Sequence, residues 1–88
     1  MKEKTILVNG EKVNGAFSFT VTKNENVKPA VITVEGIMSC DKYIEEIDTI
    51  ENEWFKLRDV NVYQESFGSD DNMFGYTFTA AGYEIMEA

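Results

Sequence analysis

Two Asn-Gly pairs within the first fifteen residues constrain the fold of this chain more than any other feature. A type I′ hairpin turn requires positive φ at both central residues, and Asn followed by Gly adopts these angles at low cost. Asn9-Gly10 follows a β-branched and aliphatic run over residues 5–8, and therefore predicts a hairpin whose second strand begins near Glu11. Asn14-Gly15 predicts either a second hairpin or a bend within a longer meander. The chain therefore begins as antiparallel sheet.

Further segments have the apolar alternation or β-branched content of strands. In residues 16–22 the apolar side chains Phe17, Phe19 and Val21 fall on one face and hydroxyl side chains on the other. Gly36 is expected to end or bend the strand that precedes it. The remaining predicted strands cover residues 30–35, 59–64 and 76–80, with 83–86 as an extension of the last.

The strongest helical pattern lies between residues 40 and 57. Five apolar side chains there are separated by 4, 3, 4 and 3 positions, which places them on one stripe of a helix. Ser39 is a suitable N-cap for this helix. The stripe consists of Tyr43, Ile47, Ile50, Trp54 and Leu57. We expect this stripe, Trp54 included, to form the core.

These elements predict an α+β fold. It comprises an antiparallel or mixed sheet of about five strands, in the order ββ(β)αββ, with one amphipathic helix packed on one face. The 88 residues are enough for one domain, which we assign to residues 1–88.

The composition argues against several chemistries. The chain has no His and one Cys, so the usual zinc sites and His-dependent nucleophiles are excluded, and no cofactor is expected. Cys40 is expected to be a buried, unreactive side chain. Asp70, Asn72 and Gly75 fit three positions of a calcium loop, but Ala81 stands where the loop needs Glu, which favours a polar hairpin tip.

Acidic residues are concentrated in the second part of the chain. Residues 1–34 hold five Lys and three Glu (5 − 3 = +2), whereas residues 35–88 hold three basic and thirteen acidic residues (3 − 13 = −10). This distribution disfavours direct nucleic-acid binding and favours a basic protein surface as partner. No apolar run approaches the length of a membrane helix or a signal peptide, so a cytoplasmic location without membrane contact is expected.

The leading hypothesis is a non-enzymatic, acidic interaction protein. Carboxylates on the predicted helix and hairpin tip would occupy the positions of phosphates on a basic, possibly nucleic-acid-binding, partner, and an aromatic side chain would anchor the contact. The candidate partner-binding residues are Glu45, Glu46, Asp48, Glu51, Glu53, Phe67, Asp70, Asp71 and Phe74. In size and charge the chain resembles small phage-type inhibitors such as anti-CRISPR proteins, which implies an inhibitory role. Alternatively, the acidity serves solubility alone.

A second hypothesis is a virion structural subunit. The run from Val31 to Ile37, with Gly36 and the predicted helix after it, resembles the strand-Gly-helix segment of phage tail and distal-tail ring proteins. This resemblance implies assembly through strand edges, which the first hairpin and the strand after Pro29 would supply. A third hypothesis, an enzyme using carboxylates alone, is disfavoured because a glycosidase-like site needs a cleft that a domain of this size rarely builds.

Overall fold

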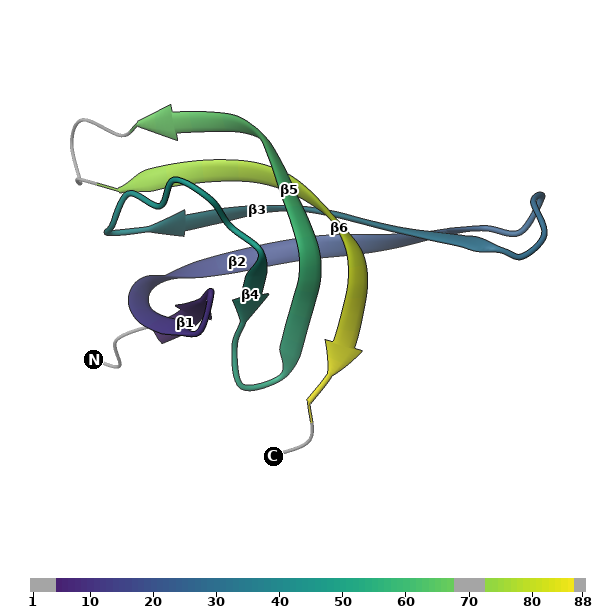
Figure 1. The fold of residues 1–88 in the computed structure, drawn as a ribbon, viewed down its shortest axis with the longest axis horizontal. Helices are drawn as coiled ribbons and strands as arrows, with labels where there is room; N and C mark the ends of the chain where they lie inside the picture. Colours follow the sequence, from purple (N-terminus) through teal and green to yellow (C-terminus); the bar gives the residue numbers. More distant parts are fainter. Residues whose placement is uncertain (1–4, 68–72, 87–88) are drawn as a thin grey trace.

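The computed structural model describes residues 5–67 and 73–86, and this part of the chain is all-β. Neighbouring strands are antiparallel and close a barrel in the order β1-β2-β3-β6-β5-β4 (Figure 1). The strands are β1 (Thr5–Val8), β2 (Glu11–Asn24), β3 (Val31–Cys40), β4 (Thr49–Glu51), β5 (Phe55–Phe67) and β6 (Phe74–Ile85). No helix that could cross a membrane occurs in these two ranges.

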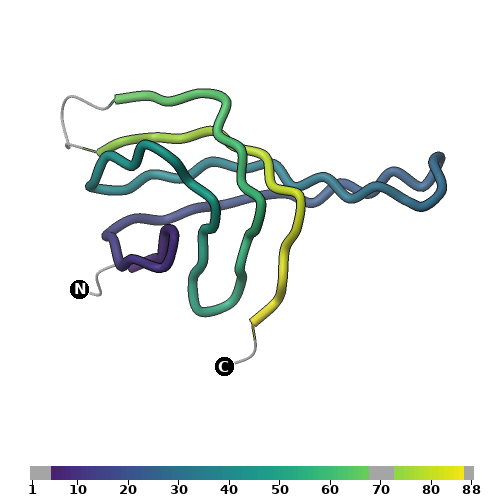
Figure 2. The backbone as a smooth tube through the Cα atoms, in the orientation of Figure 1, coloured from purple at the N-terminus to yellow at the C-terminus, as the bar shows by residue number. Residues whose placement is uncertain are grey.

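The barrel consists of two three-stranded meanders, β1-β2-β3 and β4-β5-β6, joined by residues 41–48, which we call the crossover. Pairing of β3 with β6 joins the meanders on one side. On the other side, two residues of β1 pair with two of β4 and close the barrel. Figure 2 shows the crossover passing from the end of β3 to β4.

The first hairpin is confirmed. Asn9 and Gly10 have φ angles of 53° and 84°, and Val8 pairs with Glu11 across the turn. The second pair, Asn14-Gly15, lies within β2, which continues unbroken to Asn24. The same dipeptide therefore forms a turn in one place and part of a strand in the other, because β3 pairs with β2 from Gly15 onward.

The predicted α+β fold, with a helix over residues 40–57, is wrong. This segment contains the end of β3, the crossover, β4, a turn and the start of β5. Ile47, Ile50 and Leu57 of the predicted stripe are buried, but Tyr43 is exposed and Trp54 is 56% exposed. Helical spacing therefore identified three core residues correctly and assigned them to the wrong element.

Hydrogen bonds to asparagine side chains explain why this segment is not helical. Asn52 Oδ1 accepts hydrogen bonds from the backbone N–H groups of Trp54 and Phe55, each at 2.8 Å, and forms the tight turn between β4 and β5. Asn9 Oδ1 accepts the backbone N–H groups of Asp48 at 2.7 Å and Thr49 at 3.2 Å. These N–H groups would otherwise donate within a helix, so the side-chain bonds compete with helix formation.

The core lies inside the barrel and is built from the inward rows of all six strands and one crossover residue. Of the predicted apolar face of β2, Phe17 and Phe19 pack against this core, whereas Val21 is 41% exposed. Cys40 is buried, as expected. In the described residues, the core consists of Ile6, Val8, Val13, Val34, Met38, Cys40, Ile47, Ile50, Leu57, Val60, Tyr76, Phe78 and Ala80.

Gly36 does not end β3; it occupies an inward position opposite Phe78 on β6. A Cβ at Gly36 would overlap the backbone oxygen of Ser18 and would lie 2.8 Å from both Phe19 Cβ and Phe78 Cζ. The glycine therefore makes the room that the core phenylalanine ring occupies.

We expect Gly36→Ala to lower the free energy of unfolding by about 2 kcal/mol, because the overlap includes backbone that cannot move away cheaply. Gly82→Ala is the matched control, because its Cβ would meet only Arg58 atoms at 3.8 Å or beyond. Urea denaturation of both variants measures the difference. Equal stability of the two variants would contradict the close packing at Gly36.

Candidate protein-interaction surfaces

The β2–β3 hairpin projects well beyond the barrel (Figure 1). β6 pairs with β3 only from Val34 to Cys40, whereas the pairing of β2 with β3 continues to Asn24 opposite Val31. We call residues 22–33 the arm. The arm contributes to the length of the molecule, which measures 45 × 31 × 20 Å along its principal axes.

Every residue of the arm is exposed, including apolar ones. Val31 is 49% exposed and Ile32 46% exposed, and Val27 at the tip is also exposed. A two-stranded ribbon with no third strand or helix against it is at best marginally stable in water. The arm therefore presents apolar side chains without the packing that normally accompanies them.

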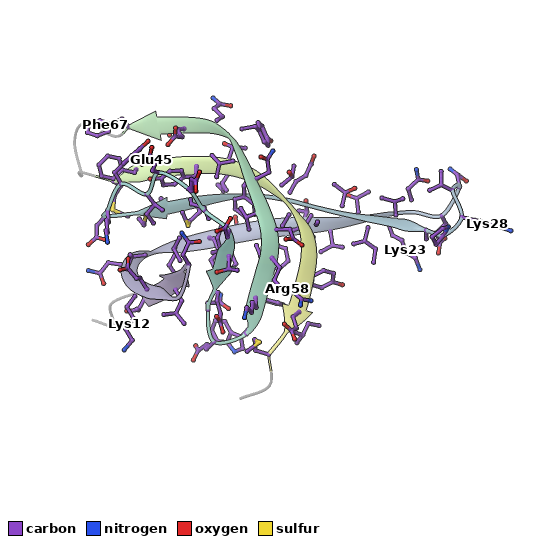
Figure 3. All side chains as sticks on the ribbon, viewed as in Figure 1. Lys12, Lys23, Lys28, Glu45, Arg58 and Phe67 are labelled. Atoms are coloured by element: carbon purple, nitrogen blue, oxygen red, sulfur yellow. The ribbon has the colours of Figure 1, made fainter. Side chains whose placement is uncertain are left out.

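The arm is basic while the rest of the chain is acidic. Two Lys and one Glu give residues 22–33 a net charge of 2 − 1 = +1, which leaves −8 − 1 = −9 for the remaining residues. Lys23 forms an ion pair with Glu25 at 3.3 Å. Lys28 has no ion-pair partner among the described residues and points away from the barrel at the far end of the arm (Figure 3).

A cluster of three aromatic side chains, which we call the aromatic end, lies at the other end of the molecule. Tyr43 comes from the crossover, Phe67 from β5 and Phe74 from β6. The ring of Phe74 meets those of Phe67 and Tyr43 edge-on, with centroids 4.9 Å and 5.7 Å apart. Phe67 is 70% exposed, so the cluster opens to solvent.

An irregularity in β5 places Phe67 in this cluster. Val62 faces the core, and simple alternation would direct residues 64 and 66 to the same face. The register shifts between Val62 and Gln64, so Glu65 lies opposite Tyr76 and Phe67 opposite Phe74. Directly opposed residues share a face of a sheet, so the bulge turns Glu65 and Phe67 toward the aromatic side chains.

Carboxylates border the aromatic end. The negative charge of Glu65 raises the pKa of the Tyr43 hydroxyl, with a smaller contribution from Glu45. Burial raises the pKa of Tyr76, whose hydroxyl accepts the backbone N–H of Ile44 at 2.9 Å and so ties the crossover to β6. The surface thus combines exposed aromatic rings with negative charge.

The nine predicted site residues are only partly brought together. The exposed Glu45, Glu46 and Asp48 lie on the crossover, half-buried Glu51 on β4 and exposed Glu53 in the following turn. No helix aligns them on one face. Phe67 and Phe74 are in contact, with Glu45 close to Tyr43 beside them. Asp70 and Asp71, like the proposed polar hairpin tip, lie outside the described residues.

Sequence reasoning missed Tyr43, Glu65 and the apolar side chains of the arm. Tyr43 was assigned to the core because of its helical spacing, and only the bulge brings Glu65 to the aromatic end. A signal for the arm is present: the polar run 22–26 followed by Pro29 interrupts the hydrophobic alternation of the strands on either side. The length of the exposed ribbon depends on where β6 stops pairing with β3.

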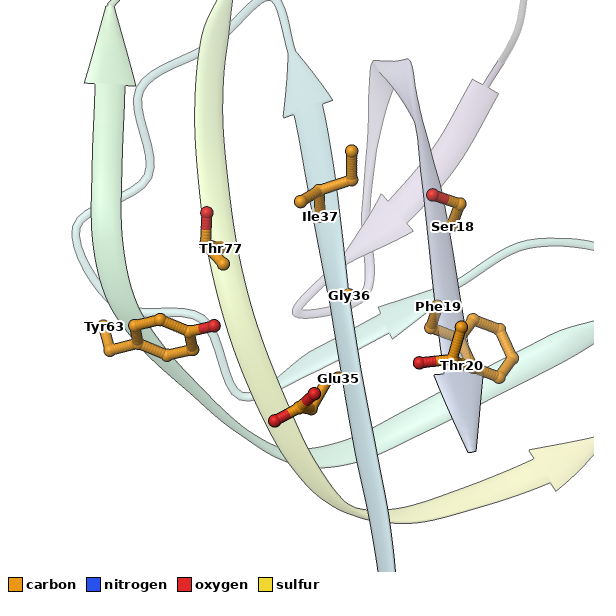
Figure 4. Close-up of a pocket in the computed structure, with 8 residues that line it drawn as sticks. All are labelled: Ser18, Phe19, Thr20, Glu35, Gly36, Ile37, Tyr63 and Thr77. Carbon is orange, nitrogen blue, oxygen red and sulfur yellow. The ribbon is translucent and has the colours of Figure 1, made fainter. Parts of the chain in front are cut away.

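A shallow hollow lies on the outer face of the sheet, at the base of the arm (Figure 4). Its volume is about 400 Å³, and its floor is Gly36, with Ile37, Tyr63 and Glu35 around it. General acid–base catalysis needs positioned proton donors and acceptors, and the only carboxylate here is Glu35. Among the described residues, no three Asp, Glu, Cys or His side chains are grouped closely enough to hold a metal ion.

The arm and the aromatic end are thus two exposed surfaces that carry apolar side chains. No protein-family model, no curated protein and no solved structure matches this chain.

Proposed function

We propose that this protein is a non-enzymatic assembly subunit that attaches to a second protein molecule, of its own or another kind, through its projecting arm. The observation that carries the proposal is the pair of exposed apolar side chains Val31 and Ile32, which project from the two faces of a ribbon that the barrel does not support. This role corresponds to the structural-subunit hypothesis, with the arm supplying the strands next to Pro29 as the attachment device.

Docking would offset two costs that the free arm bears. Burial of Val27, Val31 and Ile32 removes apolar surface from water, at roughly 25 cal/mol per Å². A partner surface would also replace the missing third layer of the ribbon. β2 and β3 leave strand edges free along the arm, which suits addition to a neighbouring sheet.

A photo-cross-linking amino acid at position 32 tests this role in the cells that make the protein. We expect illumination to link position 32 to one defined protein, identified by mass spectrometry, because a docked arm holds the probe against its partner. Ile85 is the matched control site, since it is an exposed Ile on the barrel strand β6.

The test compares the yield of cross-linked adduct at position 32 with the yield at position 85. A defined adduct from position 32, and none from position 85, supports docking through the arm. Absence of an adduct from positions 27, 31 and 32, or equal yields from the arm and from position 85, would overturn the proposed role.

The acidic-inhibitor hypothesis is a second candidate, now centred on the aromatic end rather than on a helix. The supporting observation is the exposed ring of Phe67 beside the carboxylates of Glu45 and Glu65. Aromatic side chains that enter a partner surface next to charge pairs are typical of binding hot spots. A basic segment carrying apolar side chains would be the matching partner.

A further inference from the structure

We infer that the partner of the arm is a second copy of this chain, and that the arm of one copy docks on the aromatic end of the next. This inference rests on the proposed docking function of the arm and adds the identity and site of the partner. It also assigns the basic segment that the aromatic end would bind.

Charge complementarity favours this pairing over contact between two arms. The arm carries +1 and ends in Lys28, whereas the rest of the chain carries −9. Two arms in contact would place like charges together, which costs free energy. On the aromatic end, Glu65 lies opposite Tyr76 on the same face as Phe67, and Glu45 belongs to the crossover that carries Tyr43, so negative charge borders the rings.

The two surfaces also share an apolar character. The arm supplies Val27, Val31 and Ile32 on an exposed ribbon, and the aromatic end supplies the edge-on pair Phe67 and Phe74. Aliphatic side chains against aromatic rings, flanked by opposite charges, combine burial of apolar surface with orientation by electrostatics.

Geometry requires the contact to be between molecules. Lys28 and Phe67 lie toward opposite ends of the long axis, which measures 45 Å (Figure 3). The arm cannot reach the aromatic end of its own chain. Two different surfaces in contact form a head-to-tail interface, which propagates to a ring if the rotation closes and to a filament if it does not.

Two variants of the purified protein, each defective in one of the two surfaces, test this arrangement. Val31→Thr with Ile32→Thr removes the apolar surface of the arm and retains β-branched residues. Phe67→Thr removes the most exposed ring of the aromatic end. All three side chains are exposed, so both variants are expected to fold, which circular dichroism verifies.

We expect the wild-type chain of 10.0 kDa to self-associate with rising concentration in sedimentation velocity. Each variant alone should associate about tenfold or more weakly, because loss of a central interface side chain commonly has this effect. An equimolar mixture should form a 1:1 heterodimer and no larger species, because one variant retains an arm and the other an aromatic end. Raising the salt concentration from about 0.1 M to 1 M should weaken the heterodimer, since the Debye length falls from about 10 Å to 3 Å.

The same experiment separates this inference from the proposed function. A wild-type chain that stays monomeric up to about 1 mM, or a mixture without heterodimer, overturns head-to-tail association. Association of the Phe67→Thr variant alone, at wild-type strength, also overturns it and indicates contact between arms. If position 32 nevertheless cross-links to a different protein, the docking function of the arm stands without self-assembly.

Discussion

Phe78→Ala is expected to lower the free energy of unfolding by about 3–5 kcal/mol. Phe78 is 0% exposed and lies opposite Gly36 on one neighbouring strand and Val62 on the other. Removing the ring loses its buried contacts and leaves a cavity inside the closed barrel, which the surrounding strands fill only in part. A domain of this size has about 4–13 kcal/mol of stability in total, so the substitution removes a large part of that stability and unfolds the chain if its stability lies at the lower end of this range.

Trp54→Ala serves as the control, because it removes a still larger aromatic side chain from a 56% exposed position. Trp54 uses backbone atoms in its hydrogen bonds to Asn52 and Met86: Asn52 Oδ1 accepts from Trp54 N, and Met86 N donates to Trp54 O. The substitution retains these bonds, so we expect a cost of about 1 kcal/mol or less. Urea denaturation followed by circular dichroism compares the two variants. If Trp54→Ala cost more than Phe78→Ala, the helical core predicted from the sequence would be favoured over the barrel.

Asn9→Ala is expected to cost about 3 kcal/mol, although the residue lies in an exposed turn. Asn9 Oδ1 accepts two backbone hydrogen bonds, from Asp48 and Thr49, and Asn9 Nδ2 donates to the backbone oxygen of Glu46 at 2.7 Å. Each bond contributes about 1 kcal/mol or less. The left-handed backbone of Asn9, at φ 53°, adds about 1 kcal/mol when alanine must adopt it.

Asn9→Gly separates these two contributions, because glycine accepts the left-handed backbone but makes no side-chain bonds. We expect Asn9→Gly to lower the free energy of unfolding by about 2 kcal/mol. The difference of about 1 kcal/mol from Asn9→Ala is the cost of placing alanine in the left-handed backbone conformation. Thermal unfolding resolves this difference, since 1 kcal/mol shifts the midpoint by about 4–8 °C in a domain of this size. Wild-type stability of both variants would show that Asn9 does not hold the crossover against the first hairpin.

The candidate surfaces could be predicted only in part. The position of Phe67 and Phe74 near a loop, together with nearby acidic residues, indicates an aromatic and acidic surface. In the structure the centroids of these two rings are 4.9 Å apart. The alignment of Glu45, Glu46 and Asp48 on one face depended on a helix that does not form. Glu65 could not be assigned to this surface, because its orientation depends on a bulge that ordinary alternation does not reveal.

Local chemistry in the sequence determined the first turn, the alternation of β2 and the burial of Ile47, Ile50 and Leu57. These features depend on backbone preference and on hydrophobic pattern, which neighbouring residues specify. The tertiary structure decided that residues 40–57 do not form a helix, because Asn9, nearly forty positions away, accepts hydrogen bonds from the backbone N–H groups of Asp48 and Thr49. The tertiary structure also determined the arm. The pairing of β2 with β3 extends beyond the point where β6 stops pairing with β3, and pairing between such distant segments sets where a sheet ends.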